Sequence, residues 1–433
     1  MEKRWKKMIL AGVMIAIIPV TMAGYTMMVG CTRARAADVA SETHGIYGVL
    51  SWPQNLNAVR SEIEIFTGVP QGMTPTNPVS DAVYRNAQIY TNHVMLDMSK
   101  LPSDKPLFWR VRAFDLDGNP VTDYSQPAEL KSSLMRTDRN APVPNHIYNQ
   151  GNGSILLFPV YSYTGNPGAV KYEIEVTDTY PEKTTGYAPS RYRVYADVTE
   201  LTDLYDAMPR IGTYYWRVRG MDAKGLPVGE WSVPQEIRTL PSENWKVAIF
   251  GDSISHGGGH LSFSPADMAY SYESYLNFPT INLSESGNTS EMMVERFERD
   301  VLPFHPKVLL IMGGSNSLRG GVPADSVISD LKEIQEKARS NGITPILLTL
   351  PPINPTNIEK AFQEPTDKGW QEAFSEVNQF IRSQPHIDVA APFENLGELP
   401  TWLALDGLHG DWNMKQIMAD VINQEMPRLL TNE

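Results

Sequence analysis

The sequence predicts a multidomain protein in which two all-β domains precede an α/β domain, and three observations support this prediction. The chain has 433 residues, which is too long for one ordinary hydrophobic core. A sequence motif recurs about a hundred residues apart in the first part of the chain. After Pro241 the alternation of polar and apolar residues gives way to apolar strands separated by helical periods, which is typical of an α/β domain.

The repeat consists of two pairs of matching segments. Residues 109–115 (WRVRAFD) match residues 216–222 (WRVRGMD), and a turn with glycine and proline follows each of them. Upstream, residues 62–65 (EIEI) match residues 173–176 (EIEV). Polar and apolar residues alternate within each copy, as expected of antiparallel strands with one buried face.

Residues 45–240 resemble two fibronectin type III domains. The resemblance depends on the WRVR strand, its Asp-x-x-Gly turn, and the Tyr124-Ser125 or Trp231-Ser232 pair that precedes a proline. It implies one fibronectin-III-like β-sandwich over residues 45–138 and a second over residues 140–240. We expect the tryptophan of each WRVR strand to lie in a core.

The N-terminal segment predicts export. Four basic residues precede an uncharged apolar run from Met8 to Gly30, which is the pattern of a signal peptide or an N-terminal membrane anchor. Three fates stay open for residues 1–36: cleavage after Ala36, lipidation of Cys31 in a lipobox-like Met-Val-Gly-Cys, or retention of the whole segment. We expect an exported protein at the cell envelope or cell surface, and the last two fates would tether it to the membrane.

Charge and cysteine content restrict the partners. The net charge is −13, and Lys and Arg are scattered rather than gathered with aromatic residues, which argues against nucleic acid as a partner. A single cysteine, Cys31, excludes an internal disulfide framework and a cysteine-rich metal site. His256 and His260 lack a third ligand nearby in the sequence, so we expect no metal and no organic cofactor.

The α/β domain is expected over residues 244–431. Its strands are predicted at residues 246–250, 280–283, 307–312, 345–350 and 386–390, and its helices at residues 290–301, 325–339, 370–382 and 413–429. Asn288 and Glu291 predict a capping pair for the first of these helices. Short strand-to-helix spacing implies a parallel sheet, in which ligands bind at the carboxyl ends of the strands.

Four sites with reactive or polar groups follow these strands. Ser253 comes after the first strand in Gly-Asp-Ser, and a serine hydroxyl needs a neighbouring base to become a nucleophile. Gly287 follows the second strand and Asn316 the third, and both residue types supply neutral N–H donors of the kind that a developing oxyanion requires. Asp406 and His409 precede the last helix, at a spacing that lets the carboxylate orient the imidazole. Each site alone is common in ordinary turns, but their order along one α/β domain favours an active site.

The four sites together resemble the blocks of the SGNH (GDSL) hydrolase family. The matching residues are Gly251-Asp252-Ser253, Gly287, Gly314-Ser315-Asn316 and Asp406-Gly407-Leu408-His409. The resemblance implies a flavodoxin-like, three-layer α/β hydrolase domain with Ser253 as the nucleophile, His409 as the general base and then acid, and Asp406 orienting His409. It also implies an oxyanion hole made by the N–H groups of Ser253 and Gly287 and the side-chain amide of Asn316. Ser317 and Ile254 depart from the usual pattern and leave the substrate open.

The sequence as a whole therefore predicts an exported serine esterase that works through an acyl-enzyme. We expect it to act on short acyl groups, such as acetyl, on a cell-wall or environmental carbohydrate, with His256 and Tyr270 as candidate substrate contacts. A lysophospholipase or general esterase that acts on lipid esters is the alternative within the same class. A surface glycan-binding or adhesion protein, in which the hydrolase domain is only a scaffold, is the alternative from another class.

Overall fold

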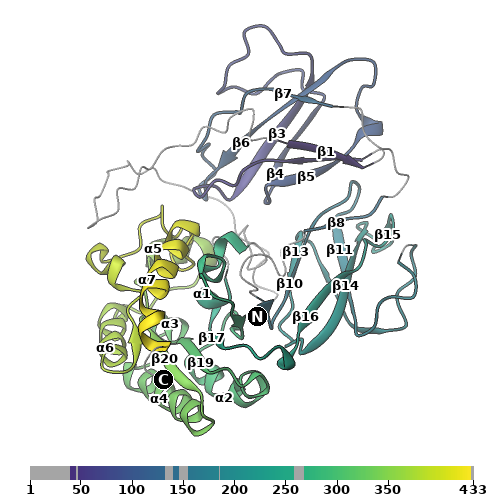
Figure 1. Cartoon of the computed structure of the whole chain (residues 1–433). Coiled ribbons are helices and arrows are strands. Elements are labelled where there is room, and N and C mark those ends of the chain that lie inside the picture. The colour runs from purple at the N-terminus through teal and green to yellow at the C-terminus, as the bar shows by residue number, and fades with distance from the viewer. Residues whose placement is uncertain are drawn as a thin grey trace.

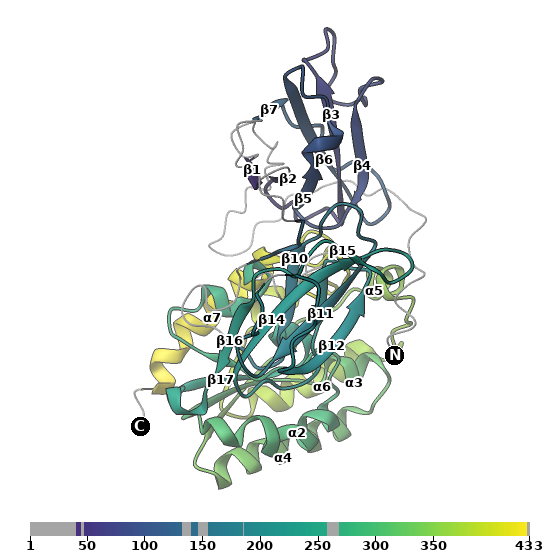
Figure 2. The same cartoon turned by 90° about the vertical axis from the view of Figure 1, so that its right-hand side faces the viewer.

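The computed structural model describes residues 40–44, 47–131, 140–145, 155–184, 186–257 and 268–430. Two β-rich parts precede an α/β part, and the second β-rich part lies against the α/β part (Figures 1 and 2). In the described part of the chain, no helix has the length and apolar character needed to cross a membrane. The predictions for residues 1–36, Cys31 and His260 fall outside the described residues.

The first β-region comprises two antiparallel sheets. Its strands are β1 (Ala40–His44), β2 (Tyr47–Ser51), β3 (Arg60–Thr67), β4 (Tyr84–Ile89), β5 (His93–Asp97), β6 (Leu107–Phe114) and β7 (Ala128–Leu130). One sheet has the order β1-β2-β5 and the other the order β4-β3-β6-β7. Trp109 is buried in the core between them, as the sequence predicts.

The second β-region repeats this arrangement. Its strands are β8 (Val143–Pro144), β10 (Val160–Thr164), β11 (Lys171–Thr177), β12 (Arg193–Thr199), β13 (Asp203–Tyr205), β14 (Gly212–Met221), β15 (Pro227–Val228) and β16 (Gln235–Thr239). One sheet has the order β13-β10-β8 and the other the order β12-β11-β14-β15, with β16 also paired to β14. Val176 of β11 faces Trp216 of β14 in the same register as Ile65 of β3 faces Trp109 of β6. The sequence repeat is therefore also a repeat of strand register.

The α/β region is built on a parallel sheet. Its strands are β17 (Val247–Gly251), β18 (Ile281–Asn282), β19 (Val308–Met312), β20 (Thr344–Leu348) and β21 (His386–Ile387), and its helices are α1 (Ser253–His256), α2 (Ser290–Asp300), α3 (Ser315–Arg319), α4 (Ala324–Ser340), α5 (Pro355–Phe362), α6 (Trp370–Arg382) and α7 (Trp412–Leu430). Every pairing among these strands is parallel, as predicted. Every residue of β17, β18 and β19 is buried, and β20 and β21 are buried after their first residue, because helices cover a parallel sheet on its faces.

One strand of this sheet comes from the segment predicted as β-sandwich. Strand β9 (Ile155–Leu156) pairs in parallel with β18, so the sheet order is β21-β20-β19-β17-β18-β9. Leu157 and Phe158, which follow β9, are fully buried in the core of the α/β region. The second β-region is therefore joined to the α/β region through backbone pairing and a shared core.

The predicted cap of helix α2 is wrong by one residue. Thr289 occupies the N-cap, and its hydroxyl accepts a hydrogen bond from the N–H of Met292. The side chain of Asn288 instead accepts a hydrogen bond from Arg296. A buried arginine thus competes for the asparagine and leaves the cap to its neighbour.

Candidate active site

Ser253 lies at the carboxyl end of β17, where the chain turns into α1. Asp252 is the N-cap of α1, and its carboxylate accepts a hydrogen bond of 2.9 Å from the N–H of Ile254. A Cβ atom on Gly251 would lie 2.3 Å from the carbonyl oxygen of Met312, so only glycine lets β17 approach β19 this closely. The short turn presents the serine hydroxyl at the edge of the sheet.

A hydrogen-bonded chain links Ser253, His409 and Asp406. The Nε2 atom of His409 lies 2.8 Å from the Oγ atom of Ser253, and its Nδ1 atom lies 2.8 Å from Oδ2 of Asp406. Asp406 is buried, and its Oδ1 atom accepts hydrogen bonds from the N–H groups of Leu408 and His409. These bonds fix the carboxylate against the imidazole, and the imidazole can then take a proton from the serine.

Gly287 and Asn316 lie at the same edge of the sheet as Ser253, because β18 and β19 flank β17 in parallel. Gly287 has a φ of 86°, a conformation that L side chains rarely adopt, and it is exposed. The side-chain amide of Asn316 donates to the carbonyl oxygen of Asn288 at 3.0 Å, and its Oδ1 atom accepts from Arg319. The loop that contains Gly287 is therefore tied to the Asn316 side chain.

Arg296 supports this edge from within the α/β region, and the sequence analysis missed it. It is 5% exposed and donates to the carbonyl oxygens of Gly251 at 2.9 Å and Leu283 at 2.6 Å, as well as to Asn288. Burial lowers the pKa of its guanidinium, and the charge of Asp300 acts on that pKa in the opposite direction. Arg296 thereby connects the ends of β17 and β18 to the loop around Gly287.

A second missed residue, Lys415, contacts the turn that carries the serine. It is fully buried, and its Nζ atom donates to the carbonyl oxygen of Ile254 at 2.6 Å. Burial lowers the pKa of Lys415 to about 8, while burial raises that of the nearby Asp252 to about 6. The sequence contains a signal for Lys415, because it shares a helical face with the apolar residues Met418 and Ile422.

The two predicted substrate contacts are not at the surface. His256 and Tyr270 are both 0% exposed. Both ring nitrogens of His256 have partners, which are the carbonyl oxygen of Phe158 at 2.7 Å and the hydroxyl of Ser286 at 2.8 Å. The sequence analysis expected both side chains to face the substrate, and the structure buries them. A polar residue near the serine gives no sign that residues of the second β-region cover the His256 ring.

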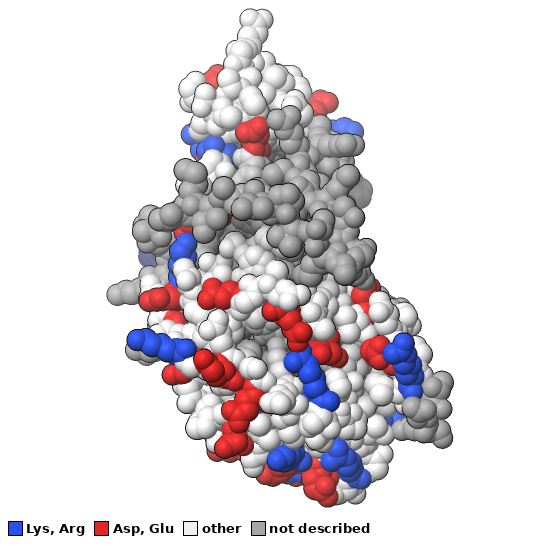
Figure 3. Space-filling view, turned by 90° about the vertical axis from the view of Figure 1, so that its left-hand side faces the viewer, with Lys and Arg blue, Asp and Glu red and all other residues white. Residues whose placement is uncertain are grey.

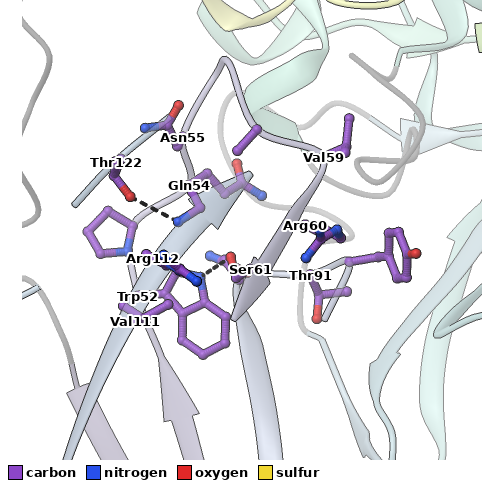
Figure 4. Close-up of a pocket in the computed structure, with 15 residues that line it drawn as sticks. Trp52, Gln54, Asn55, Val59, Arg60, Ser61, Thr91, Val111, Arg112 and Thr122 are labelled. Atoms are coloured by element: carbon purple, nitrogen blue, oxygen red, sulfur yellow. Dashed lines mark hydrogen bonds between the residues drawn. The ribbon is translucent and has the colours of Figure 1, made fainter. Parts of the chain in front are cut away.

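A small hollow lies elsewhere, in the first β-region. Its volume is about 70 Å³, and its lining extends over residues between Trp52 and Thr122 (Figure 4). Trp52 donates its indole N–H to the hydroxyl of Ser61 there. This hollow shares no residue with the Ser253–His409–Asp406 chain.

Metal ligands do not gather in the described structure. Within the residues that the structure describes, no group of three or more His, Cys, Asp or Glu side chains could hold a metal ion.

The α/β region matches a known family, and the site residues lie within or beside the match. The model of the GDSL-like Lipase/Acylhydrolase family matches residues 249–411. A Bacillus subtilis (strain 168) protein, "Uncharacterized lipoprotein YqeF", is 34% identical over 119 residues, which is 25% of this chain and 49% of that protein. The chain thus spans about half the length of this curated relative.

Solved structures are similar to part of the chain. A lipase/acylhydrolase from Enterococcus faecalis is 21% identical with a TM-score of 0.33, and the similarity covers 43% of this chain and 96% of that one. A catalytic mutant of Axe2, an acetylxylan esterase from Geobacillus stearothermophilus, is 24% identical with a TM-score of 0.33, covering 42% and 94%.

Proposed function

We propose that this chain is a serine esterase with Ser253, His409 and Asp406 as its catalytic residues, and that residues 249–411, which match the GDSL-like Lipase/Acylhydrolase family, form its hydrolase domain. The observation that supports this most directly is the pair of 2.8 Å contacts from His409 to Ser253 and to Asp406. An unpartnered serine would be a weak nucleophile, whereas this one has a positioned base.

The proposed reaction has two steps. The Ser253 oxygen attacks the acyl carbon while His409 takes the hydroxyl proton, and Asp406 stabilises the imidazolium that forms. The oxyanion of the tetrahedral intermediate accepts hydrogen bonds from the N–H groups of Ser253 and Gly287 and from the Asn316 amide. His409 then protonates the leaving alcohol, and water hydrolyses the acyl-enzyme by the same groups.

We propose a short acyl group as the preferred substrate part. Ser253 is 9% exposed and the His409 side chain 18% exposed, and the ring of Phe362 packs edge-on against the imidazole with centroids 5.9 Å apart. This low exposure and the packed ring favour a short acyl chain beside the reacting atoms. Acetyl is the smallest common acyl group that would fit.

We propose a carbohydrate rather than a membrane lipid as the alcohol part. The chain has a net charge of −13, and acidic and basic side chains are interspersed over the described surface of the face in Figure 3. Anionic lipid surfaces attract basic patches, so this acidic protein would not favour them. A neutral polysaccharide carries no such electrostatic penalty.

For the rest of the chain we propose two fibronectin-III-like modules, an export segment and retention at the cell envelope. The paired three- and four- or five-stranded sheets of each β-region support the modules. The basic and apolar pattern of residues 1–36 supports export. The name of the Bacillus subtilis relative, a lipoprotein, agrees with lipidation of Cys31.

The test is Ser253→Ala in the full chain. Esterase activity on p-nitrophenyl acetate should fall by about 10⁴-fold or more, and a fluorophosphonate probe should label the wild type alone. Asn316→Ala should lower kcat by about 10²–10³-fold with little change in KM. Retention of activity in Ser253→Ala would contradict the proposal, and an unlabelled wild type would favour the adhesion hypothesis. A steady rise of kcat/KM from acetate to palmitate esters, with an acetylated oligosaccharide untouched, would favour a lysophospholipase.

A further inference from the structure

His256 forms a buried link between two parts of the molecule. It ends helix α1, and its Nε2 atom lies 2.7 Å from the carbonyl oxygen of Phe158 while Nδ1 lies 2.8 Å from the hydroxyl of Ser286. A carbonyl oxygen only accepts, so Nε2 carries the hydrogen and Nδ1 accepts from the serine. Burial lowers the pKa of His256 to about 4, which agrees with a neutral ring.

Two residues that contact the His256 ring, Phe158 and Tyr205, belong to the segment before the α/β region. Phe158 follows strand β9, which extends the parallel sheet beside β18. The ring of Tyr205, at the end of β13, lies against the His256 ring with centroids 5.2 Å apart. The imidazole is therefore oriented by a backbone carbonyl and an aromatic ring of the second β-region.

On its other side the link reaches the loop of the proposed oxyanion hole. Ser286 directly precedes Gly287, whose N–H is a proposed donor to the oxyanion. Asn288, on the far side of the glycine, is held by Arg296 and Asn316. The glycine is thus anchored on both sides. Before it, the N–H of Glu285 donates to the carbonyl oxygen of Gly251 at 3.1 Å, and the side chain of Ser286, the residue next to the glycine, is held by His256.

Such an anchor matters for rate because an oxyanion donor must be in place before the charge develops. Gly287 is exposed, and among the described residues, its two chain neighbours apart, no heavy atom lies within 4 Å of where its Cβ would be. Described side chains therefore do not pack against the glycine at that point. Loss of the Ser286 anchor would let the N–H group depart from its position. A misplacement of about 1 Å can cost a large factor in rate.

We propose that the second β-region positions the oxyanion-hole loop through His256, which makes His256 and Ser286 positioning residues for ester hydrolysis. This inference rests on the proposed function, and it gives the second β-region a part in the reaction beyond attachment or surface display. Their roles are distinct from those proposed for Ser253, His409 and Asp406, because the two side chains bond to each other and, through His256, to Phe158.

Three single variants of the full chain break the link at different points. His256→Gln keeps a donor near the position of Nε2 and loses the acceptor for Ser286, and Ser286→Ala removes the same hydrogen bond from its other end. His256→Asn keeps an acceptor near Nδ1 and loses the bond to Phe158. His386→Gln is the matched control, because His386 lies on β21 at the opposite edge of the sheet.

We expect each of the three variants to lower kcat on p-nitrophenyl acetate by about 10-fold, with KM changed less than about twofold. The double variant of His256→Gln and Ser286→Ala should be no slower than the slower single variant, because both remove one bond. Fluorophosphonate labelling of Ser253 and the unfolding temperature are measured for every variant, and His386→Gln should match the wild type.

Other results would overturn the inference in distinct ways. Wild-type kcat in His256→Gln and Ser286→Ala would show that the loop needs no such anchor, and multiplied losses in the double variant would show that the two residues act separately. Wild-type kcat in His256→Asn alone would show that the β-region does not hold the loop. A wild-type chain that neither hydrolyses esters nor reacts with the probe would overturn the proposed function itself.

Discussion

The two β-regions share their internal design and differ in how they meet the α/β region. In each, a buried glutamate joins two arginines: Glu64 binds Arg85 and Arg110, and Glu175 binds Arg193 and Arg217. The first β-region contacts helix α5 through a surface ion pair of Asp117 with Lys360 at 3.4 Å. The second adds strand β9 to the α/β sheet and its flanking residues to the α/β core.

The difference arises in one connection. Strands β1 and β2 are separated by residues 45–46 alone, whereas the corresponding strands β8 and β10 are separated by residues 145–159, which include β9. The longer connection reaches a neighbouring sheet without disturbing the strands on either side of it. Repetition of a module therefore conserves its internal cross-links, while an added segment gives one copy a new role.

The largest effects that distinguish the two β-regions are expected from substitution of their buried glutamates, Glu64 and Glu175. Arg85 and Arg193 keep a second carboxylate, that of Glu62 or Glu173. Glu64→Gln and Glu175→Gln nevertheless take the carboxylate from a buried guanidinium, that of Arg110 or Arg217, so each should cost about 3–5 kcal/mol of unfolding free energy. Only Glu175→Gln should also lower kcat, because the second β-region carries β9 and Phe158. Denaturant unfolding and esterase assays on both variants measure this, and equal effects on kcat would mean that the two β-regions are equivalent for activity.

The stability of the region where β9 pairs with β18 should also depend on pH. Glu273 is fully buried and accepts hydrogen bonds from Thr280 and from Asn282, which faces Leu156 of β9. Burial raises the pKa of Glu273 from 4.5 to about 7. The folded state thus binds this proton more tightly than the unfolded state, and its contribution to stability is complete below about pH 4.5 and is lost as the pH rises through about 7.

Glu273→Gln should remove this pH dependence, which amounts to about 3 kcal/mol at most. Denaturant unfolding at pH 5 and pH 8 measures it, and the loss of stability between the two should be smaller in the variant than in the wild type. An identical loss in both proteins would show that Glu273 is not the titrating group.

The smallest effect is expected at the contact of the first β-region. Lys360→Ala removes its ion pair with Asp117, and the two side chains are 36% and 13% exposed. An exposed pair contributes about 0.5 kcal/mol or less, so stability and kcat should both stay near those of the wild type. A large loss of activity would show that the first β-region also supports the active site, and Asp117→Asn should then reproduce it.

The sequence by itself predicted the succession of strands and helices in the α/β region and the four candidate sites that follow those strands. Apolar runs and helical periods predicted β17 to β21 and the longer helices, with ends shifted by a few residues. Ser253, Gly287, Asn316 and the Asp406–His409 pair could be predicted as neighbours because parallel strands place their carboxyl ends along one edge. Local pattern and one general rule of topology were sufficient for these features.

Tertiary structure alone decided which side chains support that edge. Strand β9 has two residues, too few for a periodic signal, and its pairing with β18 joins segments more than a hundred residues apart. The burial of His256 follows from that pairing, which is why a histidine near the nucleophile was expected to face the substrate and instead faces Phe158 and Ser286. Sequence patterns record the face that each element buries, but contacts between distant elements are fixed only when the whole chain packs.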